Sequence, residues 1–270
     1  MSDPDQKRDR LTATDSQLLT EAAGEDVEIL SIERIQDLLG CSAAAARARA
    51  SRLATDGWLT KLRPGVYLIV PLAAGPASMY TTHEYEIATH IADPMYIGYG
   101  SALAYHGLTS VLPHAVTVVT PKRVTDREIH GVTYLVRILT ESKFFGADHY
   151  PIENNQIPIS TVEKTLVDCA DHPEFCGGLS VVAEAVRTAA RQGCTWSTVT
   201  EYLDRLASGA ATKRLVYLTD QLGITLPDRS RLVSELTRGY PQLDPTCPPS
   251  ETRSETYMLS INTSLPVADE

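Results

Sequence analysis

Residues 31 to 71 read SIERIQDLLGCSAAAARARASRLATDGWLTKLRPGVYLIVP, and this stretch decides the fold of the first part of the chain. Its apolar residues first recur at helical spacing, with Ser31 placed to cap the helix and Gly40 placed to end it. Ser42 can then cap a second helix that is rich in alanine. The stretch therefore predicts two helices joined by a tight turn.

After Gly57 the apolar pattern changes from helical to alternating, which predicts two strands, 58 to 62 and 66 to 70. Pro64 and Gly65 lie between them and suit the two central positions of a type II turn. A helix-turn-helix followed by a two-stranded ribbon predicts a winged helix-turn-helix. Such a module presents its second helix to the DNA major groove and its wing to neighbouring phosphates.

Several side chains of this module are candidates for DNA contact, because they lie on the second helix or near the wing and can donate hydrogen bonds to phosphates or bases. Residues 31 to 71 hold six basic and three acidic side chains, a balance of +3, whereas the whole chain carries −10. We therefore expect binding through a small basic face in one orientation. The predicted DNA-binding residues are Ser42, Arg47, Arg49, Arg52, Lys61 and Arg63.

The length of 270 residues suits two domains better than one. The polar start of the chain does not have the apolar core of a signal peptide, and no apolar run is long enough for a membrane helix. Five scattered cysteines are typical of reduced thiols in a reducing compartment. We expect a cytoplasmic protein, with no cofactor, no metal and no membrane partner.

The predicted fold class is α/β, in the mixed α+β sense, with the winged helix-turn-helix followed by an α/β domain whose C-terminal half is helical. Helices are expected over 81 to 91, over 102 to 106 after a Ser101 cap, and over 161 to 170 after a Ser160 cap; strands are expected over 115 to 120 and 132 to 138. Four helices follow residue 178. The predicted divisions are a disordered tail at 1–13, the winged domain at 14–75, the α/β domain at 76–240, and a proline-rich tether with a C-terminal strand at 241–270.

Beyond the winged module, the chain carries four short motifs in an order that is typical of a known family. They are YGSAL at 99–103, HGL at 106–108, IPISTVEKTLVD at 157–168 and GG at 177–178. Together with the winged module they make residues 14 to 190 similar to the AbiEi family of antitoxins. The resemblance implies an N-terminal domain that binds operator DNA and represses the operon. It also implies a C-terminal region that opposes a co-encoded AbiEii-type nucleotidyltransferase toxin.

Two enzymatic interpretations can be compared with the residues. A nucleotidyltransferase needs two carboxylates on a strand soon after a Gly-Ser turn, yet no Asp or Glu lies between Asp93 and Asp126. The second possible site gathers Glu163, Asp168, Asp171 and His172 on and after one helix, but Lys164 and Asp168 are spaced as an i,i+4 ion pair. We expect no catalytic residues and interpret this helix as structural.

The sequence thus predicts an antitoxin that also represses its own operon, with operator DNA and a nucleotidyltransferase toxin as partners. Two alternatives stay open at this point. One is an enzyme whose C-terminal domain modifies the toxin or a nucleic acid. The other is a winged-helix transcription regulator without antitoxin activity. A second basic cluster, at Lys122, Arg123 and Arg127, either extends the DNA footprint, faces the toxin or forms a solvated loop.

Overall fold

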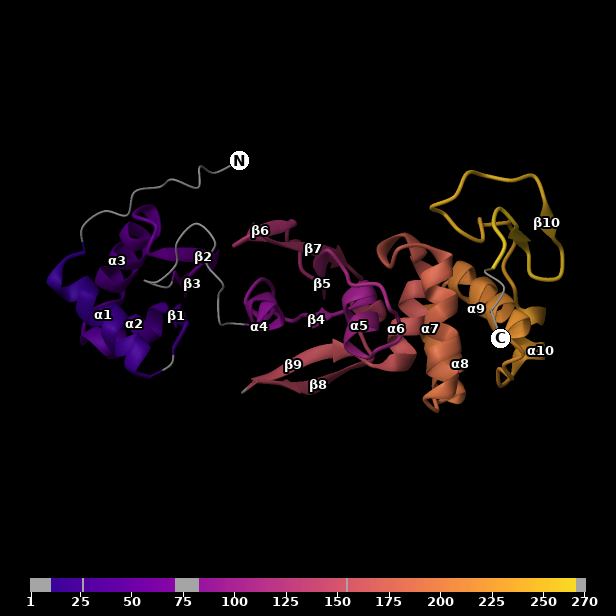
Figure 1. The fold of residues 1–270 in the computed structure, drawn as a ribbon, viewed down its shortest axis with the longest axis horizontal. Coiled ribbons are helices and arrows are strands. Elements are labelled where there is room, and N and C mark those ends of the chain that lie inside the picture. Colours follow the sequence, from indigo (N-terminus) through magenta and orange to yellow (C-terminus); the bar gives the residue numbers. More distant parts are fainter. Residues whose placement is uncertain (1–10, 26, 71–82, 154, 266–270) are drawn as a thin grey trace. The chain divides into compact units, whose positions relative to one another are not determined.

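A computed structural model describes residues 11–25, 27–70, 83–153 and 155–265 (Figure 1). The chain divides into two compact units, Met1–Asp93 and Pro94–Glu270. The predicted mixed α/β class is confirmed, since both units combine helices with sheets. The domain boundary expected near residue 75 lies in a segment outside the described residues, as does most of the tail expected at 1–13.

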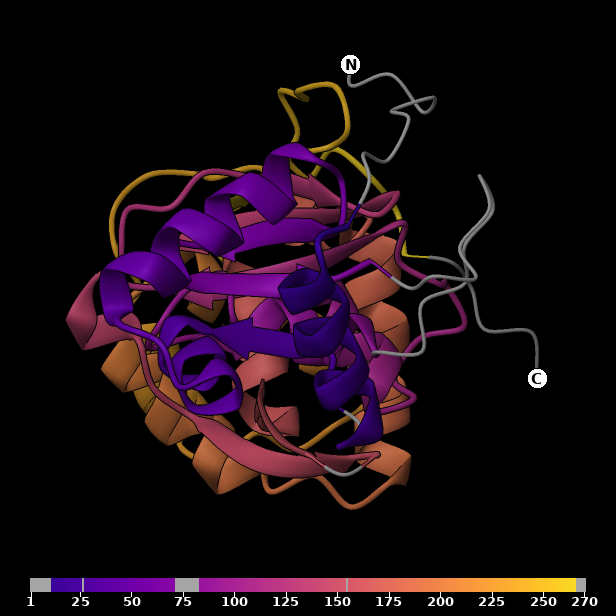
Figure 2. The same cartoon turned by 90° about the vertical axis from the view of Figure 1, so that its left-hand side faces the viewer.

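The first three helices of the first unit are each capped at the N-terminus by a side chain. Ser31 accepts a hydrogen bond from the Arg34 amide at 3.0 Å, and Gly40 ends its helix in the left-handed region, with φ of +58°. The first helix is capped by Thr12. Figure 2 looks onto these helices, which are α1 (Ala13–Gly24), α2 (Ile32–Leu39) and α3 (Ala43–Thr55).

A three-stranded antiparallel sheet completes this set of elements. The strands are β1 (Ile29–Ser31), β2 (Leu59–Arg63) and β3 (Val66–Ile69), in the spatial order β1-β3-β2. Gly65, with φ of +81°, forms the tight turn between β2 and β3 that the sequence predicts. The helices and sheet bury one apolar cluster, which includes Leu18, Ile35, Leu53, Leu59 and Tyr67. A further helix, α4 (Glu84–Thr89), follows the segment outside the described residues.

A mixed six-stranded sheet forms the first half of the second unit. Its order is β6-β7-β5-β4-β9-β8, with β5 parallel to β7 and β4 parallel to β9. The strands predicted at 115 to 120 and 132 to 138 are found with these bounds. The six strands are β4 (Tyr96–Ile97), β5 (Ala115–Thr120), β6 (Arg127–Ile129), β7 (Val132–Ile138), β8 (Ala147–Ile152) and β9 (Asn155–Ser160).

Helices of the second unit gather around α6, which contacts four of the others (Figure 1). α6 lies largely inside the unit, because seven of its ten residues are buried. The helices are α5 (Tyr99–Tyr105), α6 (Val162–Asp171), α7 (Leu179–Arg191), α8 (Trp196–Leu206), α9 (Gly209–Gln221) and α10 (Arg229–Ser234). Two short 3₁₀ turns, η1 (Glu141–Lys143) and η2 (Pro173–Phe175), connect elements. The predicted helical C-terminal half is therefore observed.

Two predicted helix caps are wrong. Ser101 lies inside α5 rather than before it, and its hydroxyl accepts a hydrogen bond from the Thr117 amide of β5 at 2.9 Å. Ser160 is the last residue of β9, and the cap of α6 is the next residue, Thr161, whose side chain accepts from the Lys164 amide. Both serines are completely buried, so their hydroxyls bond across the core instead of capping.

The proline-rich segment expected to be a tether packs against the second unit instead. Leu243 is fully buried in the main core, together with Leu259 of the short strand β11 (Leu259–Ser260), which pairs with β10 (Arg253–Ser254). The Asp244 carboxylate accepts a hydrogen bond from the Leu179 amide at 2.8 Å, at the start of α7. Four prolines prevent regular secondary structure here, but they do not prevent burial.

Arg214 on α9 connects this segment to α6. Its guanidinium donates to the carbonyls of Ala170 and Asp171, both at 2.9 Å, where α6 ends. It also donates to the carbonyls of Gln242 and Leu243 at 2.9 to 3.2 Å. Only 5% of Arg214 is exposed, and without it the buried carbonyls of Ala170 and Leu243 would lose this donor.

Replacing Arg214 with methionine keeps an unbranched apolar stem, removes the guanidinium group and leaves four carbonyls without this donor. We expect the free energy of unfolding of the second unit to fall by at least about 3 kcal/mol, because each unsatisfied buried polar group costs about 1–3 kcal/mol. Urea unfolding followed by Trp196 fluorescence in a Trp58→Phe background measures the change. The exposed Arg191 supplies the control substitution, Arg191→Met. Equal stability of the two variants would contradict the stabilising role of the Arg214 hydrogen bonds.

Candidate nucleic-acid interface

The helix α3 has one buried face and one exposed face. Ala46, Ala50 and Leu53 are completely buried against the first unit. Ser42 caps the helix by accepting a hydrogen bond from the Ala45 amide at 3.3 Å, and its side chain is at the surface. Arg47 is also exposed and lies on the part of the helix that faces solvent. These two predicted residues are accessible to a partner.

Arg49 and Arg52, by contrast, share one carboxylate of α1. Arg49 Nη1 lies 2.5 Å from Asp15 Oδ1, and Arg52 Nη2 lies 2.7 Å from both Asp15 oxygens. Asp15 is completely buried, whereas the side chains of Arg49 and Arg52 are 24% and 42% exposed. The two arginines therefore connect α3 to α1, and only Arg52 keeps a large part of its side chain at the surface.

The Asp15 carboxylate is also part of the cap of α1. It accepts hydrogen bonds from the amide and the hydroxyl of Thr12, and the Asp15 amide donates to the Thr12 hydroxyl in return, which makes a capping box. Burial alone would raise the pKa of Asp15. The hydrogen bonds from Arg52, Thr12 and Arg49 outweigh burial and lower the pKa to about 2.

The two wing candidates differ in accessibility. Lys61 is exposed on β2, opposite Tyr67 of β3. Arg63 is half-buried where β2 ends, and its charge adds to the effect of burial in lowering the pKa of His90. Among the six predicted residues, Ser42, Arg47, Arg52 and Lys61 are thus exposed, and Arg49 and Arg63 are partly buried.

Sequence reasoning missed Asp15, which proves to be the residue that organises this surface. The pattern Thr12-x-x-Asp15 is a capping-box signal and could have placed the first helix correctly. It could not have shown the ion pairs, since Arg49 and Arg52 lie 34 and 37 residues away along the chain.

The second unit has its own buried ion pair, on α6. Lys164 Nζ contacts Asp168 Oδ1, and the exposed fractions of the two side chains are 0% and 2%. The Tyr96 hydroxyl donates to Asp168 Oδ2 at 3.4 Å, and the Lys164 ammonium lies 4.5 Å from the centre of the Phe145 ring. Burial raises the pKa of the Asp168 carboxyl, and the Lys164 ammonium opposes that rise. The predicted i,i+4 pair is therefore confirmed, and it is buried rather than on the surface.

The other polar residues considered for catalysis do not converge on one point. Glu163 accepts a hydrogen bond from the Thr195 amide at 3.1 Å, where α8 begins. The Asp171 carboxylate accepts from the Ser208 hydroxyl, next to α9. His172 Nδ1 lies 2.9 Å from Glu174 Oε1 and its ring stacks on Phe175. Asp171 Oδ2 also lies 3.7 Å from His172 Nε2, whereas Glu163 bonds to a separate element.

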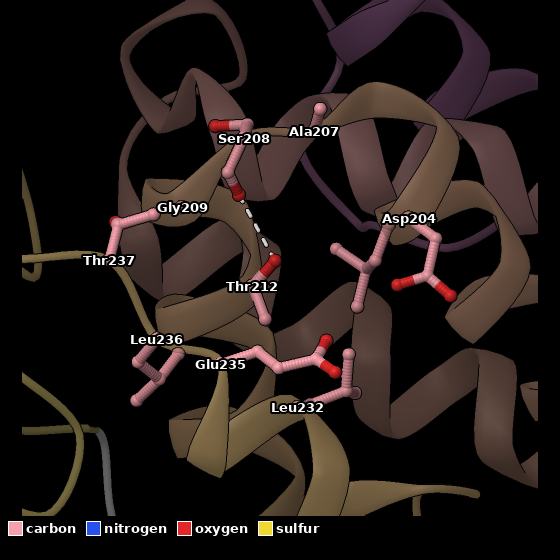
Figure 3. Close-up of a pocket in the computed structure, with 10 residues that line it drawn as sticks. Asp204, Ala207, Ser208, Gly209, Thr212, Leu232, Glu235, Leu236 and Thr237 are labelled. Atoms are coloured by element: carbon pink, nitrogen blue, oxygen red, sulfur yellow. Dashed lines mark hydrogen bonds between the residues drawn. The ribbon is translucent and has the colours of Figure 1, made fainter.

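A cavity of about 230 Å³ lies between α8, α9 and α10 (Figure 3). Asp204 and Glu235 place two carboxylates at its wall, and both pair with Arg231, at 2.8 and 3.0 Å. The Thr212 hydroxyl donates to the Ser208 carbonyl at 3.0 Å. This wall repels phosphates, so the cavity does not suit a nucleic acid. Within the described residues, no three His, Cys, Asp or Glu side chains are grouped so that they could hold a metal ion.

Comparison with known proteins bears on the fold. No protein-family model matches the chain, and no curated sequence matches it. The crystal structure of the RV2827C protein from Mycobacterium tuberculosis resembles it with a TM-score of 0.62 and 16% sequence identity, over 94% of each chain. The two chains therefore share an architecture along nearly their whole length. None of the helices in the described ranges has both the length and the apolar character that a membrane crossing requires.

The Asp15 network predicts a pH-dependent stability of the first unit. Its folded pKa of about 2 lies below the ordinary 3.8, so the stabilisation is fully present above about pH 4 and is lost as the pH falls toward 2. The pH-dependent part of the difference between wild type and Asp15→Asn should be about 2 kcal/mol. Trp58 fluorescence in a Trp196→Phe background, followed during unfolding between pH 2 and 7, measures it.

The exposed Asp37 of α2 supplies the matched control, because Asp37→Asn removes the same charge from the same unit. The Asp37→Asn difference should stay nearly constant over this range. A pH profile of Asp15→Asn parallel to that of wild type would contradict the network.

Proposed function

We propose that this protein is an antitoxin of the AbiE type, which binds operator DNA through its first unit, represses its own operon and acts in the cytoplasm. The observation that carries the DNA-binding half is the element order α1-β1-α2-α3-β2-β3 with the sheet order β1-β3-β2. In a winged helix-turn-helix, α3 is the helix that enters the major groove and β2 with β3 is the wing.

The distribution of charge supports binding in one orientation. Arg47 on α3 and Lys61 on β2 are exposed cations on the two elements that a winged module presents to DNA. Two of the other predicted cations, Arg49 and Arg52, share the Asp15 carboxylate. A chain of net charge −10 has weak attraction to DNA in general, so affinity depends on a fitted contact.

The antitoxin half of the proposal is supported by the AbiEi-like motifs in the second unit. YGSAL forms most of α5, and IPISTVEKTLVD forms the end of β9 and most of α6. Tyr99, Ile159 and Leu166 from these motifs are at most 1% exposed, so the motifs build the core of the unit. The surface that meets the toxin then lies on residues outside the motifs.

Neutralisation by binding, rather than by catalysis, is the mechanism that we propose. Asp168, the carboxylate at the centre of α6, is sealed from solvent by Lys164 and Tyr96. A substrate cannot reach it without opening the core. Glu163 and His172 are partly accessible, but they bond to different elements and do not face each other.

Arg47→Ala and Lys61→Ala should each weaken binding to the duplex upstream of the protein's own coding sequence. Each should also lower the slope of log K against log salt by about 0.9, because each substitution removes one phosphate contact. Fluorescence anisotropy over a range of salt concentrations gives both quantities. Arg191→Ala in the second unit is the control. An unchanged slope in the variant that combines Arg47→Ala with Lys61→Ala would rule out this interface.

Co-expression with the neighbouring gene tests the antitoxin half. We expect the full-length chain to restore growth, and we expect the double variant Glu163→Gln, His172→Gln to restore it equally, because a protein that acts by binding does not need these groups for proton transfer. Loss of rescue in a folded double variant would favour an enzyme. Failure of the wild-type chain to rescue would leave a transcription regulator.

A further inference from the structure

The buried carboxylate of Asp15 has an unusual position for a surface that meets DNA. It sits directly behind Arg49 and Arg52, two of the three arginines of the helix that faces DNA in the proposed function, on which this inference rests. Asp15 is completely buried, while 42% of the Arg52 side chain is exposed. The Asp15 carboxylate therefore cannot contact DNA itself, but it contacts both Arg49 and Arg52.

The geometry fixes both guanidinium groups. Asp15 Oδ1 accepts from Arg49 and from Arg52, and Asp15 Oδ2 accepts from Arg52 and from Thr12. Every lone-pair direction of the carboxylate is used, so either arginine that turned away would deprive a buried carboxylate oxygen of one of its hydrogen bonds. The exposed edge of Arg52 is thereby held in one place on α3.

The local charge is also nearly balanced. Arg52 Nη1 lies 3.8 Å from Asp56 Oδ2, at the C-terminal end of α3. Arg49 and Arg52 thus face two carboxylates, Asp15 and Asp56, which together cancel their two positive charges. An arginine pair without such partners would attract any duplex, because phosphate contacts carry no sequence information.

We propose that Asp15 is a positioning residue for DNA recognition, which holds Arg49 and Arg52 in one register so that α3 discriminates between sequences instead of binding every duplex. Its effect on DNA passes through the two arginines. Asp56 serves as an internal comparison. Its carboxylate also carries one negative charge near Arg52, but it is not paired with Arg49 and does not orient the two arginines together.

The test compares Asp15→Asn with Asp56→Asn in the full-length chain. The probes are a 20-base-pair duplex selected by the wild-type protein from a random library and a scrambled duplex of the same composition. Both variants add one unit of net positive charge, so both should bind the scrambled duplex more tightly and to a similar degree. Only Asp15→Asn should lower the ratio of selected to scrambled affinity, by about tenfold, which is the loss expected for one good specific contact.

Equal ratios in the two variants would overturn the proposal, since Asp15 would then act through charge alone. If Asp15→Asn does not stay folded at the assay temperature, Arg52→Lys takes its place. This variant keeps the charge but not the planar group that bonds both Asp15 oxygens. It should lower the ratio without tighter binding to the scrambled duplex, and an unchanged ratio would overturn the proposal. A wild-type protein that prefers no duplex would instead refute the DNA-binding function itself.

Discussion

Five hydrogen bonds from the Arg214 guanidinium hold the second unit together. They satisfy carbonyls at the C-terminal end of α6, where a positive charge is also favoured by the helix dipole. The same group holds the carbonyls of Gln242 and Leu243, and so places the segment that brings Asp244 to the start of α7. Arg214 on α9 thereby binds the C-terminal end of α6 directly. Through the segment 242–244 it also supports the start of α7.

Both units keep ionised groups inside, and both surround them completely with partners. Asp15 has Thr12 and two arginines, and Lys164 has Asp168 with aromatic rings beside it. Removing one member of such a pair is costly, because the other is left as an unpaired buried charge. The two pairs differ in one respect that matters for function: the partners of Asp15 reach the surface, whereas those of Asp168 do not.

Much of the fold could be predicted from the sequence, because most of its signals are local. Ser31, Gly40 and Ser42 mark helix ends through their own backbone geometry, and β5 and β7 follow from their β-branched residues. The Asp15 pairs could not be predicted, because they depend on how α1 packs against α3. Composition also misled at residues 241 to 250, where the prolines suggested a tether although Leu243 belongs to the core. Four of the six candidate residues are exposed, as the sequence suggested: Ser42, Arg47, Arg52 and Lys61.

The packing of Leu243 and Leu259 has a consequence for the order in which the two units mature during synthesis. The apolar cluster of the first unit needs only residues up to about 70, so it can close while the rest of the chain is still being translated. The cluster around α6 includes Leu259 and cannot be completed before that residue leaves the ribosome. A nascent chain can therefore carry a closed apolar cluster in its first unit while the main cluster of the second unit still lacks Leu259.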